Sequence, residues 1–270
     1  MSIGTNIRRL REERNLTQEA LADRLGVTFQ TVSAWERDKN NPETEKLQQL
    51  AAVFNVSMSE LMEEKEVFDL KTSLFSWEKM KTYIKTTARE KHMNETLRAV
   101  DFAEEKHAGQ FRKNSDIPYI YHPLTLACHA MAMGLYDDTL ISACLLHDTV
   151  EDCGVTKEEL PVNERCREVV QLVTHADEPN CTKEEALAKY YAAIKKDPMA
   201  CMVKCIDRCN NLTTMSWGFS RKKRIEYIRE TEQYYPEMLR VIKAVPEYYN
   251  AAWLLKYQIE SMLDIYKRLS

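Results

Sequence analysis

The spacing of apolar residues divides the chain into two stretches of helical pattern. Along residues 5–61, apolar side chains recur every three or four positions in short sets, which predicts a group of short helices. Beyond about residue 77 the same spacing continues in longer runs. Only 6 glycines and 8 prolines interrupt the 270 residues, and 30% of the residues are charged, which is typical of an all-α protein. We therefore predict two all-α domains, over residues 1–62 and 77–270.

Residues 63–76 form the predicted linker between these domains. The linker contains no glycine, and it carries apolar residues that continue to the start of the second domain: Phe68, Leu70, Leu74, Phe75 and Trp77. Such residues have no reason to be apolar unless they pack on something. We therefore expect a partly helical, packed linker and energetic coupling between the two domains.

Within the first domain, residues 16–37 have the pattern of two short helices joined by a tight turn. Thr17 is placed to cap the first helix, and Gly26 to form the turn. The second helix is expected over residues 27–37, with Val32 and Trp35 facing the core. Its polar side chains are then free to face a partner: Thr28, Gln30, Thr31 and Ser33.

This helix-turn-helix, with Trp35-Glu36-Arg37 and Asn41-Pro42 after it, resembles the XRE family of Cro/cI-like DNA-binding domains over about 57 residues. The resemblance implies a five-helix domain that binds double-stranded DNA, commonly as a homodimer, with its second helix in the major groove. It also implies the contacts, with Gln18 on the DNA backbone and four residues on base edges: Thr28, Gln30, Thr31 and Ser33.

The charge of this domain limits how it can bind DNA. Residues 1–62 carry eight Lys and Arg and nine Asp and Glu, so the general attraction to phosphate has to come from a local cluster. The basic residues expected to form it are Arg8, Arg9, Arg11, Arg14 and Lys39. The alternative is a helix-turn-helix that serves protein interaction or dimerisation.

In the second domain, residues 145–152 (LLHDTVED) form a candidate metal site. No glycine or proline interrupts this stretch or its lead-in, so we expect one helix in which His147 lies over Glu151. Asp148 would likewise lie over Asp152. A neutral imidazole and a carboxylate suit a divalent cation such as Mn²⁺, and carboxylates beside that metal can orient or deprotonate a water. Two adjacent ligands do not hold a metal alone, so a helix end with solvated acids is the alternative.

Two further segments supply additional ligand types. His122 stands directly before Pro123, a residue favoured in the first turn of a helix, and Asp207 lies on a predicted buried helix. The chain order is therefore His122, then His147-Asp148, then Asp207. This order resembles the ligand pattern of the HD-domain metal-dependent phosphohydrolases, which implies that these four residues bind the metal.

The resemblance extends to the hydrolase domain of RelA/SpoT homologues, which remove the 3′-pyrophosphate of guanosine tetra- and pentaphosphate. It is carried by residues 107–113, 118–123, 146–152 and 207–211. It implies Mn²⁺ as the cofactor, with Glu151 and Asp152 positioning the attacking water and accepting its proton. The implied substrate-binding residues are Arg112, Lys113, Lys204, Arg208, Asn211 and Thr214.

Two departures leave the substrate open. Cys209 and Asn210 stand where the family frequently has leucine and histidine, so the nucleobase preference can differ. One alternative is an enzyme for another phosphorylated nucleotide, such as an adenine alarmone or NADPH. Another is a transcriptional regulator that senses a nucleotide without turnover. Residues after Pro236 provide for only one or two more helices, so we expect no synthetase part.

Cysteine usage and hydropathy indicate the compartment. Eight cysteines include no Cys-x-x-Cys pair, so reduced thiols are expected and a structural zinc site is not. Cys201, Cys205 and Cys209 share one helical face, where packing is expected. No apolar run approaches the ~20 residues that span a bilayer, and the first residues do not begin a signal peptide. We therefore predict a cytoplasmic protein without a membrane segment.

Overall fold

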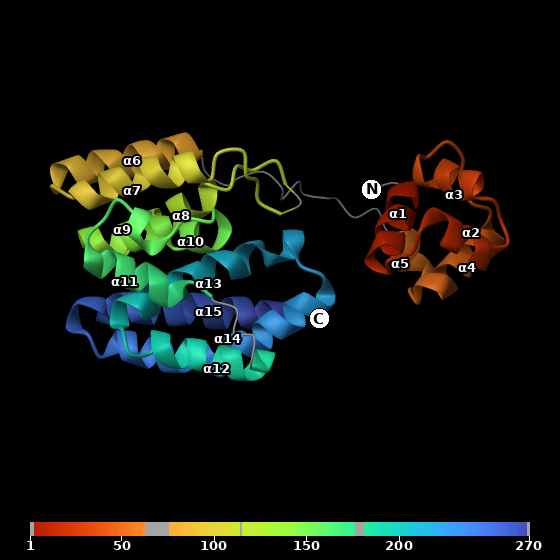
Figure 1. Ribbon diagram of the computed structural model, residues 1–270. Coiled ribbons are helices and arrows are strands. Elements are labelled where there is room, and N and C mark those ends of the chain that lie inside the picture. The colour runs from red at the N-terminus through yellow and green to blue at the C-terminus, as the bar shows by residue number, and fades with distance from the viewer. Residues whose placement is uncertain (1–2, 63–75, 114, 176–180, 269–270) are drawn as a thin grey trace. The chain divides into compact units, whose positions relative to one another are not determined.

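A computed structural model describes residues 3–62, 76–113, 115–175 and 181–268 (Figure 1). These residues form helices and turns, and their one β-type contact is an isolated bridge between Phe111 and Pro118. The predicted all-α class is therefore confirmed. The chain separates into two compact units, Met1–Leu70 and Lys71–Ser270. The predicted linker of residues 63–76 lies outside the described residues except for its last position.

The first unit contains five short helices, as predicted (Figure 1). They are α1 (Ile3–Glu13), α2 (Gln18–Leu25), α3 (Phe29–Glu36), α4 (Thr44–Phe54) and α5 (Met58–Met62). Their buried apolar residues form one core, in which Ile7, Val32, Leu50 and Phe54 are inaccessible to solvent. This core fixes α2 and α3 as the helix-turn-helix.

Local capping explains where α2 begins and ends. The Thr17 hydroxyl accepts a hydrogen bond from the Ala20 N–H at 3.1 Å, so α2 begins after Thr17. Gly26 ends the helix with φ 63°, a left-handed conformation that glycine adopts without steric cost. Both predicted roles are confirmed.

The second helix of the pair begins later than predicted. Thr28 has extended backbone angles, and its hydroxyl accepts a hydrogen bond from the Thr31 N–H at 3.2 Å. Thr28 is therefore the N-cap of α3, and residues 27 and 28 precede the helix. The reason is that a threonine side chain satisfies one of the unpaired N–H groups of the first turn.

The second unit is built from longer helices and two short 3₁₀ turns. The helices are α6 (Trp77–Glu90), α7 (Asn94–Lys106), α8 (Tyr121–Ala132), α9 (Asp138–Leu146), α10 (Thr149–Asp152), α11 (Glu164–Val173), α12 (Lys183–Ile194), α13 (Pro198–Gly218), α14 (Arg221–Lys243) and α15 (Tyr249–Arg268). The 3₁₀ turns are η1 (Lys157–Glu159) and η2 (Pro246–Tyr248).

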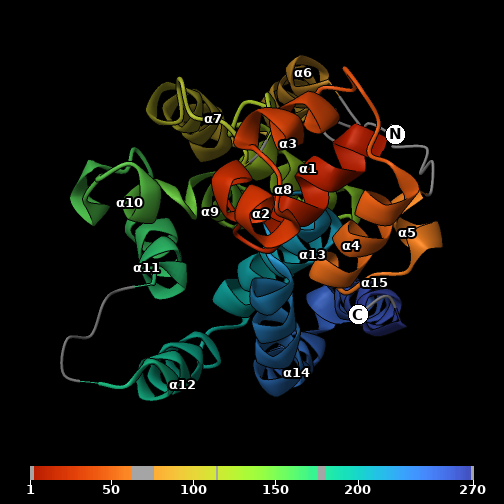
Figure 2. The same cartoon turned by 90° about the vertical axis from the view of Figure 1, so that its right-hand side faces the viewer.

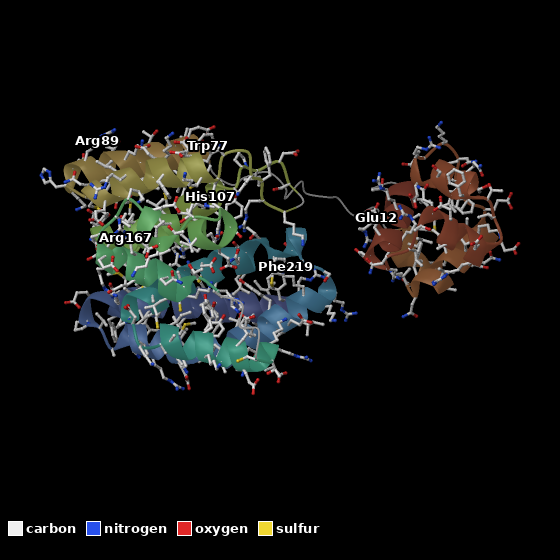
Figure 3. The ribbon with its side chains drawn as sticks, in the orientation of Figure 1. Glu12, Trp77, Arg89, His107, Arg167 and Phe219 are labelled. Carbon is white, nitrogen blue, oxygen red and sulfur yellow. The ribbon has the colours of Figure 1, made fainter. Side chains whose placement is uncertain are left out.

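Helices α6 and α7 form an antiparallel pair. Trp77 at the start of α6 and His107 after the end of α7 lie at one end of this pair, and Arg89 lies at the other (Figure 3). The segment that joins α7 to α8 therefore begins at the end that carries Trp77. Helices α7 and α8 both pack on α9.

The centre of the unit is formed by α9 and α13. Every residue of α9 from Leu140 to Leu146 is buried. Helix α13 packs against α8, α9, α11, α14 and α15, and Figure 2 shows α13, α14 and α15 close together. Because α8, α9 and α13 contact one another, polar side chains that these helices carry can meet inside the unit.

The three cysteines of α13 pack in the core, as predicted. Cys201, Cys205 and Cys209 are free thiols and are buried. Burial raises the pKa of Cys201 to about 12, so this sulfur stays protonated at neutral pH. In the part of the chain that the structure describes, no helix is long and apolar enough to cross a membrane.

Candidate active site

Four of the predicted ligands come together between α8, α9 and α13. His122 lies in the first turn of α8, His147 and Asp148 follow α9, and Asp207 lies in α13. The Nε2 atom of His122 is 3.4 Å from Asp148 Oδ2 and 3.3 Å from Asp207 Oδ1. The Nε2 atom of His147 is 3.1 Å and 3.8 Å from the same two oxygens. Two imidazoles thus face two carboxylates.

Hydrogen bonds at the far side of each ring determine which nitrogen carries the proton. The Nδ1 atom of His147 is 3.0 Å from the carbonyl oxygen of Cys144, which can only accept, so Nδ1 donates. The Nδ1 atom of His122 is 2.5 Å from Asn210 Oδ1, also an acceptor. In the neutral rings, both Nε2 lone pairs therefore point at the carboxylates.

This arrangement fits a divalent cation. His147 Nε2 is buried and has no hydrogen-bond partner. Ligand atoms of His122, His147 and Asp207 lie within 4.8 Å of one another, and Asp148 Oδ2 adds a fourth donor beside the two rings. Lone pairs that converge without a proton between them repel, and either a proton on one ring or a cation at their centre removes that repulsion. Burial lowers the pKa of His147, but Asp148 and Asp207 outweigh it and raise that pKa, so the two carboxylates attract positive charge to this position. Nitrogen and carboxylate donors suit Mn²⁺ among other divalent metals.

The carboxylates of this cluster remain ionised. Burial favours the protonated form, but His147 and His122 outweigh it and hold the pKa of Asp148 well below its usual range. For Asp207, Lys204 is the main group that outweighs burial and lowers the pKa. The Lys204 Nζ atom is 3.4 Å from Asp207 Oδ2. Both aspartates are therefore negatively charged at neutral pH and available to a cation.

The ligand segment is not the single helix that the sequence predicted. Helix α9 ends at Leu146, residues 147 and 148 form a turn, and α10 starts at Thr149. The His147 ring donates to the Cys144 carbonyl, and the Thr149 hydroxyl donates to the Leu146 carbonyl at 2.7 Å. These side chains occupy carbonyls of the last turn of α9, and the helix ends there.

The two predicted acids are the exposed residues of α10, and each has one defined side-chain contact. Glu151 Oε2 accepts a hydrogen bond from the His175 backbone N–H at 3.1 Å. Asp152 Oδ2 is 3.0 Å from the hydroxyl of Tyr119, which also lies 2.6 Å from Asp148 Oδ2. Burial and the nearby Asp148 raise the pKa of Tyr119 far above its usual value, so the hydroxyl keeps its proton.

Three predicted substrate-binding residues meet beside the ligands. An Arg112 nitrogen, Nη2, donates to Asn211 Oδ1 at 3.2 Å and to the Thr214 hydroxyl at 3.1 Å. Asn211 Nδ2 in turn donates to Asp207 Oδ1 at 2.5 Å. Lys113 is exposed, and it lies close to Gly218 at the end of α13, where a Cβ added to the glycine would be 3.3 Å from the Lys113 Cβ. The guanidinium of Arg112 is thus linked to the ligand cluster by one amide side chain.

Arg208, predicted to bind substrate, is instead held by the protein. Its guanidinium donates to Glu230, to the Thr231 hydroxyl at 3.1 Å and to the Tyr191 hydroxyl at 3.1 Å. It also lies 3.5 Å from the centroid of the Tyr227 ring. Because protein groups use both terminal nitrogens of this buried side chain, we remove Arg208 from the proposed substrate-binding residues.

Two polar residues at the site were not predicted to act there. Asn210 orients His122, and the spacing of polar residues along α13 could have identified it: Lys204, Asp207, Asn210, Asn211 and Thr214 all lie along an otherwise largely apolar helix. Tyr119 lies in the motif of residues 118–123, but the sequence did not indicate its partners, because Asp148 and Asp152 lie 29 and 33 residues away.

The first unit presents the predicted DNA-contacting residues on and beside α3. Gln30 is exposed, and Thr31 and Ser33 are partly exposed. The Thr28 hydroxyl lies 2.9 Å from that of Thr31. Gln18, predicted to contact the DNA backbone, donates through Nε2 to Glu36 Oε2 at 2.7 Å.

The predicted basic cluster is largely neutralised. Arg8 pairs with Glu12 at 3.0 Å, and Arg9 with Glu13 at 2.8 Å. Arg11 pairs with the buried Glu36 at 2.6 Å. Carboxylates one turn away on α1, or on α3, accept these bonds, so three of the five predicted basic residues are paired with acids of the same unit. Their contribution to DNA binding stays a prediction.

Comparisons with known proteins agree with this architecture. A helix-turn-helix family model matches residues 7–61, and an HD domain family model matches residues 99–238. The chain is 34% identical over 173 residues to the guanosine-3′,5′-bis(diphosphate) 3′-pyrophosphohydrolase of Aquifex aeolicus, an alignment that covers 63% of this chain and 23% of that protein. It is 37% identical over 139 residues to the bifunctional (p)ppGpp synthase/hydrolase RelA of Mycobacterium tuberculosis, covering 50% and 18%.

Each alignment thus spans less than a quarter of the relative's length. Among solved structures, one of a metazoan orthologue of SpoT, described as hydrolysing ppGpp, matches with a TM-score of 0.50. That match has 20% sequence identity and covers 63% of this chain and 94% of the other. At this identity the structural match shows a shared fold.

Proposed function

The chain belongs to the HD-domain family, and from this premise we propose that it is a metal-dependent hydrolase that removes the 3′-pyrophosphate of guanosine tetra- or pentaphosphate. The relatives in Aquifex aeolicus and Mycobacterium tuberculosis carry names that refer to this reaction or its substrate. The products would be pyrophosphate and GDP or GTP. We expect the protein to act in the cytoplasm, where we also expect its proposed nucleotide substrate and DNA partner.

The observation that carries the proposal is the convergence of two imidazole lone pairs on two ionised aspartates. Hydrogen bonds from the Nδ1 atoms of His122 and His147 direct both Nε2 atoms inward. Buried like charges are costly, and a cation between the two rings and the two carboxylates would offset that cost. We therefore propose His122, His147, Asp148 and Asp207 as the metal ligands, with Mn²⁺ as the metal.

The mechanism assigns one task to each group around this centre. The metal, when bound, supplies Lewis-acid polarisation of a phosphoryl oxygen and favours deprotonation of the attacking water. Asp152 and Glu151 orient that water and take its proton. Water adds to the phosphorus attached to the 3′ oxygen, and the bond from that phosphorus to the 3′ oxygen breaks. The 3′ oxygen leaves with the electron pair and takes up a proton to become the hydroxyl of GDP or GTP, which balances the proton that the acids accepted from the water. Pyrophosphate is released on the other side.

Substrate binding is proposed for the cations and amides beside the ligands. Arg112 has a fork of N–H donors that suits a diphosphate, and Asn211 and Thr214 already hold it near Asp207. Lys204 adds positive charge beside Asp207, and the exposed Lys113 follows Arg112 in the chain and is proposed to contact the same diphosphate. Binding energy from these groups would orient the 3′ phosphorus toward the water held by the acids.

An assay of nucleotide hydrolysis by the purified 270-residue protein tests this function directly. The protein would be incubated with Mn²⁺ and a panel containing ppGpp, pppGpp, an adenine alarmone and NADPH, and the products would be separated by anion exchange. Release of pyrophosphate from ppGpp or pppGpp is expected. Turnover of only another nucleotide would move the proposal to that substrate, and tight binding without turnover would favour a nucleotide-sensing regulator.

We also propose that the first unit binds double-stranded DNA, as a homodimer, through α3. Its support is the helix-turn-helix match and the exposed polar side chains of Gln30, Thr31 and Ser33. Selection from a random DNA pool would supply a sequence, and Gln30→Ala should weaken its binding by about 1–3 kcal/mol. The control is Gln48→Ala, an exposed glutamine on α4. Failure to select any DNA would favour a protein-interaction role.

A further inference from the structure

Tyr119 lies in the connection between α7 and α8, and its backbone is fixed on both sides. Its N–H donates to the Gln110 carbonyl at 2.9 Å, and its carbonyl accepts from the His122 N–H at 2.9 Å. The bridge between Phe111 and Pro118 closes the same loop. The position of Tyr119 is therefore set by the segment that also delivers the ligand His122.

The Tyr119 ring is enclosed by groups that belong to the proposed site. The His107 ring lies 4.7 Å away between centroids, and the His122 ring lies 5.9 Å away in an edge arrangement. The guanidinium carbon of Arg112 lies 5.7 Å from the Tyr119 centroid. These neighbours restrict the rotation of the ring, so the direction of its hydroxyl is determined by packing.

The Tyr119 hydroxyl has one proton to donate and faces two carboxylates. It lies 2.6 Å from Asp148 Oδ2 and 3.0 Å from Asp152 Oδ2. A phenol can donate only one hydrogen bond, and the shorter distance indicates donation to Asp148. Asp148 Oδ2 also lies 3.4 Å from His122 Nε2 and 3.1 Å from His147 Nε2, so it faces both rings and would be available to a cation held there.

Cation binding changes which carboxylate is the better acceptor. Once Asp148 Oδ2 donates its electron density to a metal, it attracts the phenol proton less, and Asp152 Oδ2 at 3.0 Å becomes the stronger acceptor. A hydrogen bond to Oδ2 would hold the Asp152 side chain and leave Oδ1 for the water. We infer that the Tyr119 hydroxyl is a positioning group for Asp152, and that metal binding turns its proton from Asp148 to Asp152. This inference rests on the proposed function.

Tyr119→Phe tests the inference, because it keeps the ring and removes only the hydroxyl. The matched control is Tyr121→Phe, a buried tyrosine two positions further along the chain. Tyr119→Phe should lower kcat by about 10- to 100-fold, the usual effect of losing an outer-shell partner. KM and the Kd for Mn²⁺, measured by calorimetry, should stay within about threefold, and Tyr121→Phe should match the wild type. An unchanged kcat, or loss of Mn²⁺ binding along with kcat, would overturn the inference.

A double-mutant cycle shows whether Tyr119 acts through Asp152. In the Asp152→Asn protein, adding Tyr119→Phe should lower kcat by less than about threefold, because the group that the hydroxyl positions has already been altered. If Tyr119→Phe lowers kcat as much in this background as in the wild type, the two residues act independently and the positioning role is wrong.

The proton switch has a readout that does not depend on turnover. Adding Mn²⁺ alone should shift the near-ultraviolet tyrosine absorbance of the wild type and of Tyr121→Phe, and this component should be lost in Tyr119→Phe. Identical difference spectra in all three proteins would overturn the switch. If the wild type hydrolyses no nucleotide of the panel but shows the Tyr119-dependent spectrum, the proposed function fails while the switch stands.

Discussion

Two neighbouring residues of α13, Asp207 and Arg208, belong to two different clusters of charged side chains. Protein groups pair the charge of one cluster and leave negative charge in the other. Arg208 has a carboxylate, two hydroxyls and the faces of Tyr227 and Tyr235 around its guanidinium. Asp207, one position earlier, faces imidazole lone pairs and a second aspartate, with Lys204 as its nearby cation. The Arg208 cluster is complete in charge, because Glu230 pairs with the guanidinium, although the buried Arg208 Nε atom has no hydrogen-bond partner. The Asp207 cluster is not complete in charge.

This difference separates a structural charge from a binding site. A buried ion whose charge is paired within the protein holds helices together, and here both terminal nitrogens of Arg208 on α13 are bonded to α12 and α14. A buried group of ions whose lone pairs converge is costly for the fold until a ligand arrives. The same helix therefore contributes to stability on one face and to the proposed chemistry on the next.

The sharpest way to break the comparison is to remove a ligand from the incomplete cluster. Asp207→Ala or His147→Ala should abolish hydrolysis and Mn²⁺ retention, since three donors remain of four. The helical content should change little in both variants. The free energy of unfolding without metal should fall in Asp207→Ala, which leaves the buried Lys204 without its carboxylate, and should change less in His147→Ala. Elemental analysis, nucleotide turnover and circular dichroism measure these three properties. Retained Mn²⁺ with normal turnover would show that the metal site is wrongly assigned.

Removing Arg208 should have the opposite effect, on stability before chemistry. Arg208→Met leaves the partly buried Glu230 without its partner, and breaking a buried pair typically costs about 3–5 kcal/mol of unfolding free energy. Denaturant titration measures it. The control is Arg165→Met, whose pair with Asp197 is more exposed and should contribute only about 0–1 kcal/mol. Equal losses in the two variants would mean that burial does not distinguish these ion pairs.

Glu151 lies at the open edge of the incomplete cluster and should affect turnover alone. Glu151→Gln keeps the shape of the side chain and removes its charge, so nucleotide binding should persist while kcat falls by about 10²-fold. Equilibrium binding of ppGpp and single-turnover kinetics separate the two quantities. An unaltered rate would identify Glu151 as a solvated helix residue that only accepts the His175 N–H.

The two units provide a broader version of the comparison, because one is proposed to bind DNA and the other a nucleotide. The apolar, glycine-free linker sequence motivates the prediction that they are coupled. Coupling energies are commonly about 1–3 kcal/mol, or about 5- to 150-fold in affinity. Titrating selected DNA against Glu151→Gln protein with and without ppGpp, at fixed salt, measures the coupling. Equal DNA affinities would mean that the units are only tethered.

The contribution of the Arg208 cluster to stability should depend on pH, because it includes the carboxylate of Glu230. Burial raises the pKa of Glu230, but Arg208 and Tyr191 outweigh it, so the folded-state pKa lies below the unfolded value of 4.5. This contribution to stability is present above about pH 4.5 and is lost as pH falls through the folded pKa. Denaturant titrations of the wild type and of Glu230→Gln at about pH 5 and about pH 3 test this. The unfolding free energy should fall less between the two pH values in Glu230→Gln than in the wild type. Parallel pH curves would show that Glu230 does not carry this dependence.

Much of the architecture follows from residue order alone. Helical spacing predicted the all-α class, capping chemistry predicted Thr17 and Gly26, and small apolar character predicted buried thiols on α13. These features depend on neighbours within one or two turns, so local sequence determines them. The residue types and the chain order of the four proposed metal ligands could also be predicted, because the family motifs are recognised from the sequence alone.

The remaining features depend on contacts between distant segments. Asn210 meets His122 across 88 residues, and Tyr119 meets Asp152 across 33. The opposite surroundings of Asp207 and Arg208 arise because α13 packs on α8 and α9 with one face and on α14 with another. Adjacent side chains on a helix point about 100° apart, so packing alone decided which of these two charges was satisfied by the protein and which was left for a ligand.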